Sequence, residues 1–240
     1  MAVLGFLHTS SVHVVPFDAL VAELAPGWTA VHVVDESLLS DARLRGQVDA
    51  EITARVQARL TELAGSAPDV VICTCSTIGE ASEQLGALRV DRPMAAEAVR
   101  LAGLGNGSIL IVASSASTVT PTTSLIDDEL LRIAEPTVIA VVTEGLERAH
   151  QQVLLVEEAW GFFERGDMPG YANCVAEAIR AHMSSTSGDA GDIGFAPDVI
   201  VLAQASMREV PPLLADLDIP VLTSLALAVK AATTVANFAS

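Results

Sequence analysis

Cysteine is scarce in this chain, which has three among 240 residues: Cys73, Cys75 and Cys174. An odd and small number is too few for the disulfide framework of a secreted protein of this length, so a reducing cytoplasm is expected. Cys73 and Cys75 are close enough in sequence to suggest zinc binding. No second Cys or His pair follows at ligand spacing, and we therefore predict no metal site.

Positive charge is also scarce. The sequence has 13 Lys and Arg against 30 Asp and Glu, a formal net charge of −17. Such a surface repels phosphate backbones and anionic membranes, so we expect no nucleic-acid partner and no membrane partner. No stretch approaches the ~20 apolar residues of a membrane span. The first residues have no basic region typical of a signal peptide, and we interpret residues 2–8 as a strand.

Short apolar runs alternate with helical patterns along the chain, which is typical of parallel βαβ units. An apolar content of 51% is ample for a core. The predicted strands are 2–8, 29–34, 69–75, 108–113, 137–142, 198–204 and 219–223. The predicted helices lie near 16–25, 45–65, 79–86, 93–103, 119–133, 145–164, 169–183, 208–216 and 225–238. The pattern predicts an α/β fold.

One strand pattern occurs twice. Residues 67–77 read APDVVICTCST and residues 196–206 read APDVIVLAQAS. The two copies align without a gap, and Cys75 then pairs with Gln204. Such a repeat predicts two similar halves, with a thiol in one half where the other has an amide.

A weaker repeat relates residues 3–10 to residues 109–116, and it pairs His8 with Ser114. Together the repeats predict two domains. Residues 1–93 plus 207–240 form an N-terminal domain carrying Cys75, and residues 94–206 form a C-terminal domain carrying Gln204. The predicted helix at 225–238 is apolar enough to be buried between domains or subunits, so a homo-oligomer is one expected assembly.

Polar residues follow four of the predicted strands. In parallel α/β sheets, ligands bind beyond the carboxyl ends of the strands, where backbone N–H groups are unpaired. Hydroxyls there also cap helices, so capping alone would explain some of them. None of these residues is Lys or Arg, and hydroxyl and backbone donors suit a carboxylate ligand. The candidates are His8, Thr9, Ser10, Cys75, Ser76, Thr77, Ser114, Ser117, Thr118, Gln204 and Ser206.

These motifs resemble the aspartate/glutamate racemase superfamily, which includes hydantoin racemase, maleate isomerase and arylmalonate decarboxylase. Residues 75–77 (Cys-Ser-Thr) are similar to the family's first Cys-Asn-Thr motif. Residues 201–206 resemble its second motif, Val-Leu-Gly-Cys-Thr-His, but Gln204 replaces the cysteine and Ser206 the histidine. His8 stands where glutamate racemases carry an acidic residue. Residues 113–118 resemble the hydroxyl loop that binds the substrate carboxylate.

The resemblance implies two pseudo-symmetric Rossmann-like (flavodoxin-like) domains with an interdomain cleft, and cofactor-independent proton transfer next to a carboxylate. Cys75 is then the catalytic thiol, because a thiol pKa of ~8.5 can be lowered by its surroundings. Gln204 has no comparable protonation change. His8, if cationic, would lower the pKa of Cys75, or it is a structural histidine at a helix entrance. Glu144 lies near an acidic position of glutamate racemases and is a candidate second base.

Several activities remain open at this stage. The leading prediction is an isomerase, a racemase or epimerase that acts on a small carboxylate such as an amino acid. A one-thiol decarboxylase and a maleate-type cis–trans isomerase are alternatives, as is a non-catalytic protein that binds a small carboxylate. Cys73 and Cys174 are expected to be packing residues.

Overall fold

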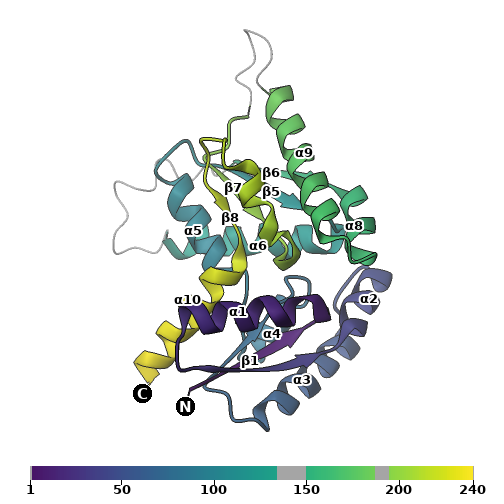
Figure 1. The fold of residues 1–240 in the computed structure, drawn as a ribbon, viewed down its shortest axis with the longest axis vertical. Helices are drawn as coiled ribbons and strands as arrows, with labels where there is room; N and C mark the ends of the chain where they lie inside the picture. The colour runs from purple at the N-terminus through teal and green to yellow at the C-terminus, as the bar shows by residue number, and fades with distance from the viewer. Residues whose placement is uncertain (1, 134–149, 187–194, 240) are drawn as a thin grey trace. The chain divides into compact units, whose positions relative to one another are not determined.

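The computed structural model describes residues 2–133, 150–186 and 195–239 (Figure 1). The chain divides into two compact units. Unit 1 comprises Met1–Pro93 and Ser224–Ser240, and unit 2 comprises Met94–Thr223. Each unit contains one four-stranded parallel sheet with helices packed against it, which confirms the predicted α/β class.

Unit 1 has the strand order β2-β1-β3-β4. Its strands are β1 (Val3–His8), β2 (Thr29–Val34), β3 (Val70–Cys73) and β4 (Leu88–Arg89). Its helices are α1 (Val14–Leu24), α2 (Glu36–Arg45), α3 (Ala50–Ala64), α4 (Gly79–Gln84), α10 (Ser224–Ala239) and the short 3-10 helix η1 (Ser11–His13). Consecutive residues of a strand point to opposite faces of the sheet. Phe6 packs on Phe17 of α1, whereas Leu7 packs with Leu38 of α2 and Ile52 of α3, so helices cover both faces.

Unit 2 has the order β6-β5-β7-β8. Its strands are β5 (Ser108–Ala113), β6 (His150–Leu155), β7 (Val199–Leu202) and β8 (Val221–Leu222). Its helices are α6 (Ala116–Ile133), α8 (Glu157–Glu164), α9 (Met168–Thr186), the 3-10 helices η2 (Ala205–Glu209) and η3 (Pro211–Leu214), and α5 (Arg92–Ala102), which begins just before the unit boundary. Every residue of β5 is buried, as expected for a central parallel strand.

The repeated Ala-Pro-Asp motif fixes the start of two neighbouring strands in each unit. The Asp69 carboxylate accepts the Val3 N–H at 2.7 Å, and the Asp69 N–H donates to the Val3 carbonyl at 2.9 Å. Asp198 makes the same two bonds with Ser108, at 2.8 and 2.9 Å. Its carboxylate also accepts the Asn106 N–H at 2.9 Å. The duplicated sequence therefore corresponds to duplicated backbone hydrogen bonding.

Strand register confirms one expected pairing and corrects the other. Leu4 pairs with Val70 in unit 1 as Ile109 pairs with Val199 in unit 2. Cys75 and Gln204 therefore follow equivalent strands at equivalent positions. The predicted match of His8 with Ser114 is wrong by one residue, because the same register aligns His8 with Ala113 and Thr9 with Ser114. The sequences of two apolar runs can be aligned in several ways. The pairing of each strand with its neighbour fixes which residues are equivalent.

Helix α3 shows how the local sequence sets an element. Asp49 caps its start, with Oδ1 accepting the Ile52 N–H at 2.9 Å. Ile52, Val56 and Leu63 lie on one stripe and are fully or almost fully buried against the sheet. Burial of each such side chain contributes about 1.5–3 kcal/mol. Replacing Asp49 with Ala would lower the free energy of unfolding by about 1 kcal/mol.

Some predicted elements are wrong. The helix expected over 145–164 is strand β6 followed by helix α8, and residues 145–149 lie outside the described part. β6 is an edge strand with exposed and half-buried positions, so its polar glutamines obscure the strand pattern. The helix expected at 208–216 is replaced by η2 and η3. Helix α2 and the two-residue strand β4 were not predicted. The predicted strand 137–142 lies outside the described residues.

Residues 207–223 pack in unit 2, although the sequence analysis assigned them to the N-terminal domain. The physical reason is strand β8, whose Val221 and Leu222 pair with Ile200 and Val201 of β7. The chain returns to unit 1 at Ser224, the first residue of α10. Helix α10 then packs against α1 and β3.

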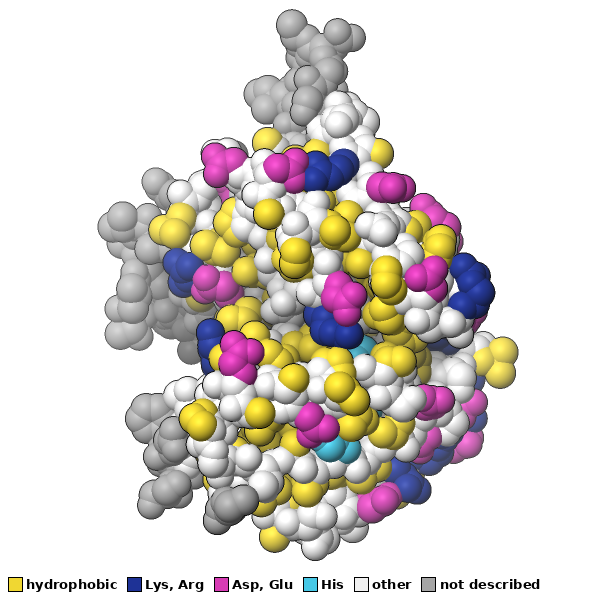
Figure 2. Space-filling model, in the orientation of Figure 1, with side chains coloured by type: hydrophobic (Ala, Val, Ile, Leu, Met, Phe, Trp, Pro, Cys, Tyr) yellow, Lys and Arg dark blue, Asp and Glu magenta, His cyan; other side chains and the backbone are white. Residues whose placement is uncertain are grey.

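Acidic side chains are spread over the face drawn in Figure 2, several of them next to an arginine or lysine. Ion pairs such as Arg100–Glu97 and Arg180–Asp216 account for part of the positive charge. Among the helices in the described ranges, none is long and apolar enough to cross a membrane.

Candidate functional site

In unit 1, the carboxyl ends of β1 and β3 lie next to each other because the strands are neighbours. The fold therefore brings together two predicted groups, residues 8–10 and residues 75–77. Thr74 joins the two strand ends directly: its N–H donates to the Leu7 carbonyl at 3.0 Å, and its Oγ1 lies 2.9 Å from His8 Nδ1. Thr9, Ser76 and Thr77 are buried at this edge and Ser10 is half-buried.

The two neighbouring thiols differ in environment. Cys73 is fully buried, and its Sγ donates to the Cys75 carbonyl at 3.6 Å. Burial, with a smaller effect of Cys75, raises the pKa of Cys73 to about 12, so Cys73 remains a thiol near neutral pH. Its predicted packing role is confirmed. Cys75 lies just beyond the end of β3. It is 9% exposed and belongs to the same apolar cluster as Ile78.

His8 does not supply the cation that was considered for lowering the Cys75 pKa. Burial, followed by repulsion from His32 and His13, lowers the pKa of His8 to about 3. The imidazole is therefore neutral near pH 7. Its ring packs on Phe17 of α1, whereas Cys75 belongs to the apolar cluster formed with α2 and α3.

A hydrogen-bonded chain runs from Asp18 to the residue before Cys75. His32 Nε2 lies 3.1 Å from Asp18 Oδ1 and donates to it, because a carboxylate oxygen accepts. His32 Nδ1 lies 2.8 Å from His8 Nε2. His8 Nδ1 in turn lies 2.9 Å from the Thr74 hydroxyl. The chain links the imidazole of His8 to the end of β3 through Thr74, whose hydroxyl also lies 3.2 Å from the Leu7 carbonyl.

A buried ion pair lies at the end of β4, and sequence reasoning missed it. Arg89 Nε and Nη2 donate to the two Asp91 carboxylate oxygens at 2.9 and 3.0 Å, and the side chains are only 4% and 1% exposed. Gly79 leaves room for the guanidinium, because a Cβ there would lie 2.8 Å from Arg89 Nε. The sequence feature that could have predicted this ion pair is the spacing of two residues between opposite charges. In an extended chain, this spacing places both side chains on the same side.

In unit 2, the ends of β5 and β7 are joined by Ser114 and Gln204. Gln204 Oε1 accepts the Ser114 N–H at 2.6 Å and the Ser114 hydroxyl at 2.8 Å. Tyr171 Oη of α9 lies 2.8 Å from Ser114 Oγ and 2.9 Å from Ser206 Oγ. The structure thus brings three predicted residues, Ser114, Gln204 and Ser206, into one network.

Tyr171 completes this network and was not predicted. It is the one tyrosine of the sequence, and an aromatic residue within a helical pattern reads as core. It is fully buried, and burial raises the pKa of its hydroxyl, so Tyr171 stays protonated. Two further predicted residues, Ser117 and Thr118, lie in the first turn of α6, where Ser117 Oγ is 3.0 Å from Ser115 Oγ and Thr118 is buried.

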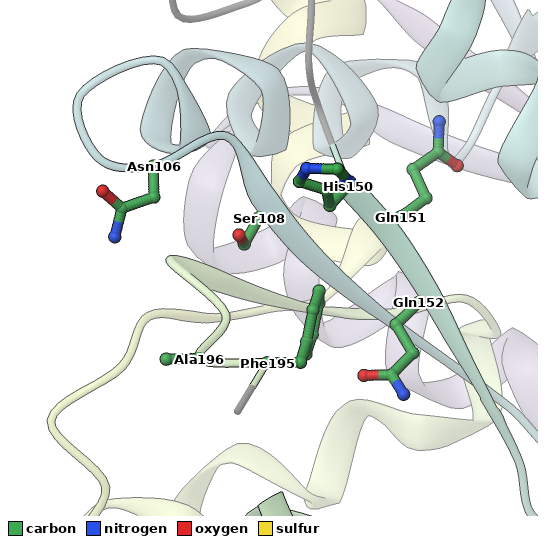
Figure 3. Close-up of a pocket in the computed structure, with 7 residues that line it drawn as sticks. All are labelled: Asn106, Ser108, His150, Gln151, Gln152, Phe195 and Ala196. Atoms are coloured by element: carbon green, nitrogen blue, oxygen red, sulfur yellow. The ribbon is translucent and has the colours of Figure 1, made fainter. Parts of the chain in front are cut away.

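Glu144 lies outside the described residues, and its role as a second base stays a prediction. Across the described ranges, no three His, Cys, Asp or Glu side chains gather as a metal site requires. A pocket of about 640 Å³ in unit 2 is drawn in Figure 3. It lies at the amino ends of β5 and β6, away from the polar carboxyl ends, and is lined by Asn106, Ser108, His150, Gln151, Gln152, Phe195 and Ala196.

Solved structures with this fold are known. Picrophilus torridus aspartate racemase has a TM-score of 0.65 and 12% identity, covering 99% of this chain and 95% of that one. Glutamate racemase from Francisella tularensis subsp. tularensis SCHU S4, solved with D-glutamate, has a TM-score of 0.59 and 13% identity, covering 99% and 82%. Allantoin racemase from Klebsiella pneumoniae has a TM-score of 0.57 and 12% identity, covering 100% and 89%.

No protein-family model matches the sequence, and no curated protein matches it. The likeness is thus one of structure at 12–13% identity. Over nearly its whole length, the chain has the fold of these aspartate, glutamate and allantoin racemases.

Proposed function

We propose that this protein is a cofactor-independent enzyme of the aspartate/glutamate racemase superfamily, which acts on a small carboxylate through Cys75. The observation that carries the proposal is the position of the two residues at equivalent strand ends. Cys75 follows β3 and Gln204 follows β7 in the same register, in a fold shared with solved racemases. One thiol thus stands where a symmetric fold offers two equivalent places.

The proposed chemistry is proton transfer at the carbon next to the substrate carboxylate. Cys75 as a thiolate removes that proton, the electron pair moves into the enolate, and the resulting thiol returns a proton to the carbon. The Cys73 thiol is held protonated by burial and does not compete for this role. Neutral His8 acts only through Thr74, as a positioning residue beside Cys75.

Hydroxyls and backbone N–H groups at the strand ends are the proposed anchors of the substrate. They are neutral donors, so they hold a carboxylate without the strong attraction of a lysine or arginine. The aspartate and glutamate racemase neighbours favour an amino acid as substrate. The proposed anchors are Thr9, Ser10, Ser76, Thr77, Ser117, Thr118 and Gln204. Ser114 and Ser206, also predicted as anchors, are bonded within the network that holds Gln204 and support it.

A second candidate follows from Gln204 itself. An amide does not ionise near neutral pH, so Gln204 can act neither as a base nor as an acid toward the substrate. Stereospecific protonation of an enolate after loss of CO₂ requires only one thiol. A one-thiol decarboxylase is therefore the alternative that this residue favours.

The test is proton NMR in D₂O with a panel of amino acids, α-aryl malonates and maleate. Wild type, Cys75→Ala and Cys174→Ala are compared, the last being a matched loss of a half-buried thiol in α9. We expect α-hydrogen exchange or turnover in wild type and Cys174→Ala, and its loss in Cys75→Ala.

The labelling pattern separates the reactions. Deuterium in both enantiomers indicates racemisation with a second base, deuterium in one enantiomer indicates one-sided exchange, and CO₂ loss indicates the decarboxylase. Equal activity of wild type and Cys75→Ala would refute the thiol mechanism. If no compound of the panel shows exchange or turnover but one of them raises the thermal stability, a non-catalytic carboxylate-binding protein would be favoured.

A further inference from the structure

The orientation of the Gln204 amide is fixed by its neighbour. The oxygen and nitrogen of a glutamine side chain are usually assigned only from their surroundings. Here the surrounding group is the Ser114 backbone N–H, which can only donate, at 2.6 Å. The atom facing it must therefore be Oε1, and Nε2 must point away from Ser114.

The same bond sets the direction of the whole hydroxyl network. The Ser114 hydroxyl gives its one proton to Gln204 Oε1, at 2.8 Å. It must then accept from Tyr171 Oη, at 2.8 Å, and Tyr171 must accept from Ser206 Oγ, at 2.9 Å. Each hydroxyl has a single proton, so the order Ser206 to Tyr171 to Ser114 to Gln204 is the one arrangement that satisfies every bond.

What Gln204 can offer a ligand follows from this order. Both lone pairs of Oε1 are occupied, and the side chain is half-buried at the end of β7. Within the described part of the chain, no group hydrogen bonds to Nε2. Gln204 therefore presents two N–H donors and no acceptor. A matching ligand atom is an oxygen acceptor, as in a carboxylate or a carbonyl group.

We propose that Ser206, Tyr171 and Ser114 hold Gln204 as a fixed amide donor for an oxygen of a small carboxylate ligand. Tyr171 is then a positioning residue, which acts on the ligand only through Ser114 and Gln204. This inference deepens the proposed function and rests on it for the ligand class. It assigns unit 2, which has Gln204 at the position equivalent to Cys75, to recognition and not to proton transfer.

The experiment follows the side-chain amide signals of Gln204 by ¹H–¹⁵N NMR. They are identified by their loss in Gln204→Glu. The full chain is titrated with acetate, malonate, succinate and L-glutamate, and with 1,4-diaminobutane as a probe that only donates. We expect saturable shifts of the Gln204 signals with at least one carboxylate and none with the diamine.

Two variants test the donor and its support. Gln204→Glu keeps an acceptor for Ser114 but replaces the outward N–H groups with an acidic oxygen. Carboxylate affinity should fall about 10- to 100-fold, as expected for the loss of a hydrogen bond to a charged group. Gln57→Glu, on the exposed face of α3, adds the same charge and should leave affinity within about twofold.

Tyr171→Phe removes only the hydroxyl that connects Ser206 with Ser114. We expect a severalfold loss of affinity and broadened Gln204 amide signals, with the fold retained because the ring still fills its place. A purely structural tyrosine would lower thermal stability without changing those signals. Gln204→Asn, which shortens the amide, should also lose affinity.

The outcomes keep this inference separate from the proposed function. Shifts of the Gln204 amide in a protein without turnover, or in Cys75→Ala, support the inference even where catalysis fails. Turnover with no carboxylate-dependent shift at Gln204 overturns the inference and leaves the Cys75 mechanism standing. Equal carboxylate affinity of Gln204→Glu and Gln57→Glu also overturns it.

Discussion

Units 1 and 2 place different side chains at equivalent points of their two sheets. In unit 1, Cys75 is an ionisable group, and its sulfur has no hydrogen-bond partner among the described residues. In unit 2, the equivalent Gln204 accepts two hydrogen bonds through its oxygen and does not ionise near neutral pH. A duplicated backbone therefore does not imply duplicated chemistry, and we propose that the thiol serves proton transfer and the amide recognition.

The neighbouring strands differ in the same way. β1 ends in His8, whose imidazole bonds to Thr74 across the gap between strands. β5 ends in Ala113. The next residue, Ser114, donates its hydroxyl to Gln204, which follows β7. Both units thus connect the ends of their two central strands with a side-chain hydrogen bond, but they use different residues to do so.

The largest expected difference between the units is in catalysis. Cys75→Ala should lower kcat about 10²- to 10⁴-fold, since it removes the acid–base group. Gln204→Ala should mainly raise KM, by about tenfold, since it removes a hydrogen bond made in both the ground and transition states. Steady-state kinetics, with the substrate identified by the NMR panel, separates the effect on kcat from the effect on KM. A loss of kcat in Gln204→Ala as large as in Cys75→Ala would contradict this division of roles.

The fourth strands offer a stability test. β4 ends in Arg89, paired with buried Asp91, whereas β8 ends in the apolar Leu222. Asp91→Ala should lower the free energy of unfolding by about 3–5 kcal/mol, because it leaves the guanidinium buried without its carboxylate.

Replacing both members of the pair with leucine should recover most of that loss. Urea denaturation of the single and double variants measures the difference. A double variant as unstable as Asp91→Ala would show that the arginine itself, and not the uncompensated charge, maintains unit 1.

Acid should affect unit 1 through His8. Above pH 6.5 this histidine is neutral in the folded and the unfolded chain and contributes nothing. As the pH falls from 6.5 to about 3, the unfolded chain binds a proton there and the folded chain does not. The free energy of unfolding should therefore fall by up to about 1.4 kcal/mol per pH unit from this group.

Urea midpoints of wild type and His8→Gln between pH 7 and 4 test this effect. The variant keeps a polar side chain but does not titrate, so its stability should depend less steeply on pH. Parallel curves for the two proteins would mean that His8 is protonated in the folded state.

The smallest effect compares the two copies of the repeated aspartate. Asp198 accepts two backbone N–H groups, and Asp69 accepts one. Asp198→Ala should cost about 2 kcal/mol and Asp69→Ala about 1 kcal/mol of unfolding free energy, with kcat unchanged in both. Chemical denaturation measures the costs. An equal or larger loss in Asp69→Ala would show that these bonds do not set the difference.

The sequence predicted the fold class because parallel strands are continuous apolar runs, as in residues 70–72 and 108–113, and because the Ala-Pro-Asp repeat marks equivalent strands. It failed where the pattern is weak. Strand β6 has half its side chains exposed and was mistaken for a helix, and β4 is two residues long.

The sequence correctly placed Cys75, Ser114, Gln204 and Ser206 after strands, and their functional roles stay predictions. It missed Tyr171, because this residue lies in helix α9 and reaches Ser114 only through tertiary packing. The charge state of His8 was also beyond the sequence, since it depends on burial and on two histidines brought close by the fold.

The path of the chain between the units constrains how the protein is made. Unit 2 is inserted into unit 1, whose last helix, α10, follows the whole of unit 2 and packs on α1 and β3. On the ribosome, all of unit 2 is synthesised before α10 emerges, so the inserted unit can complete its core first. Unit 1, which carries Cys75, acquires its final packing last.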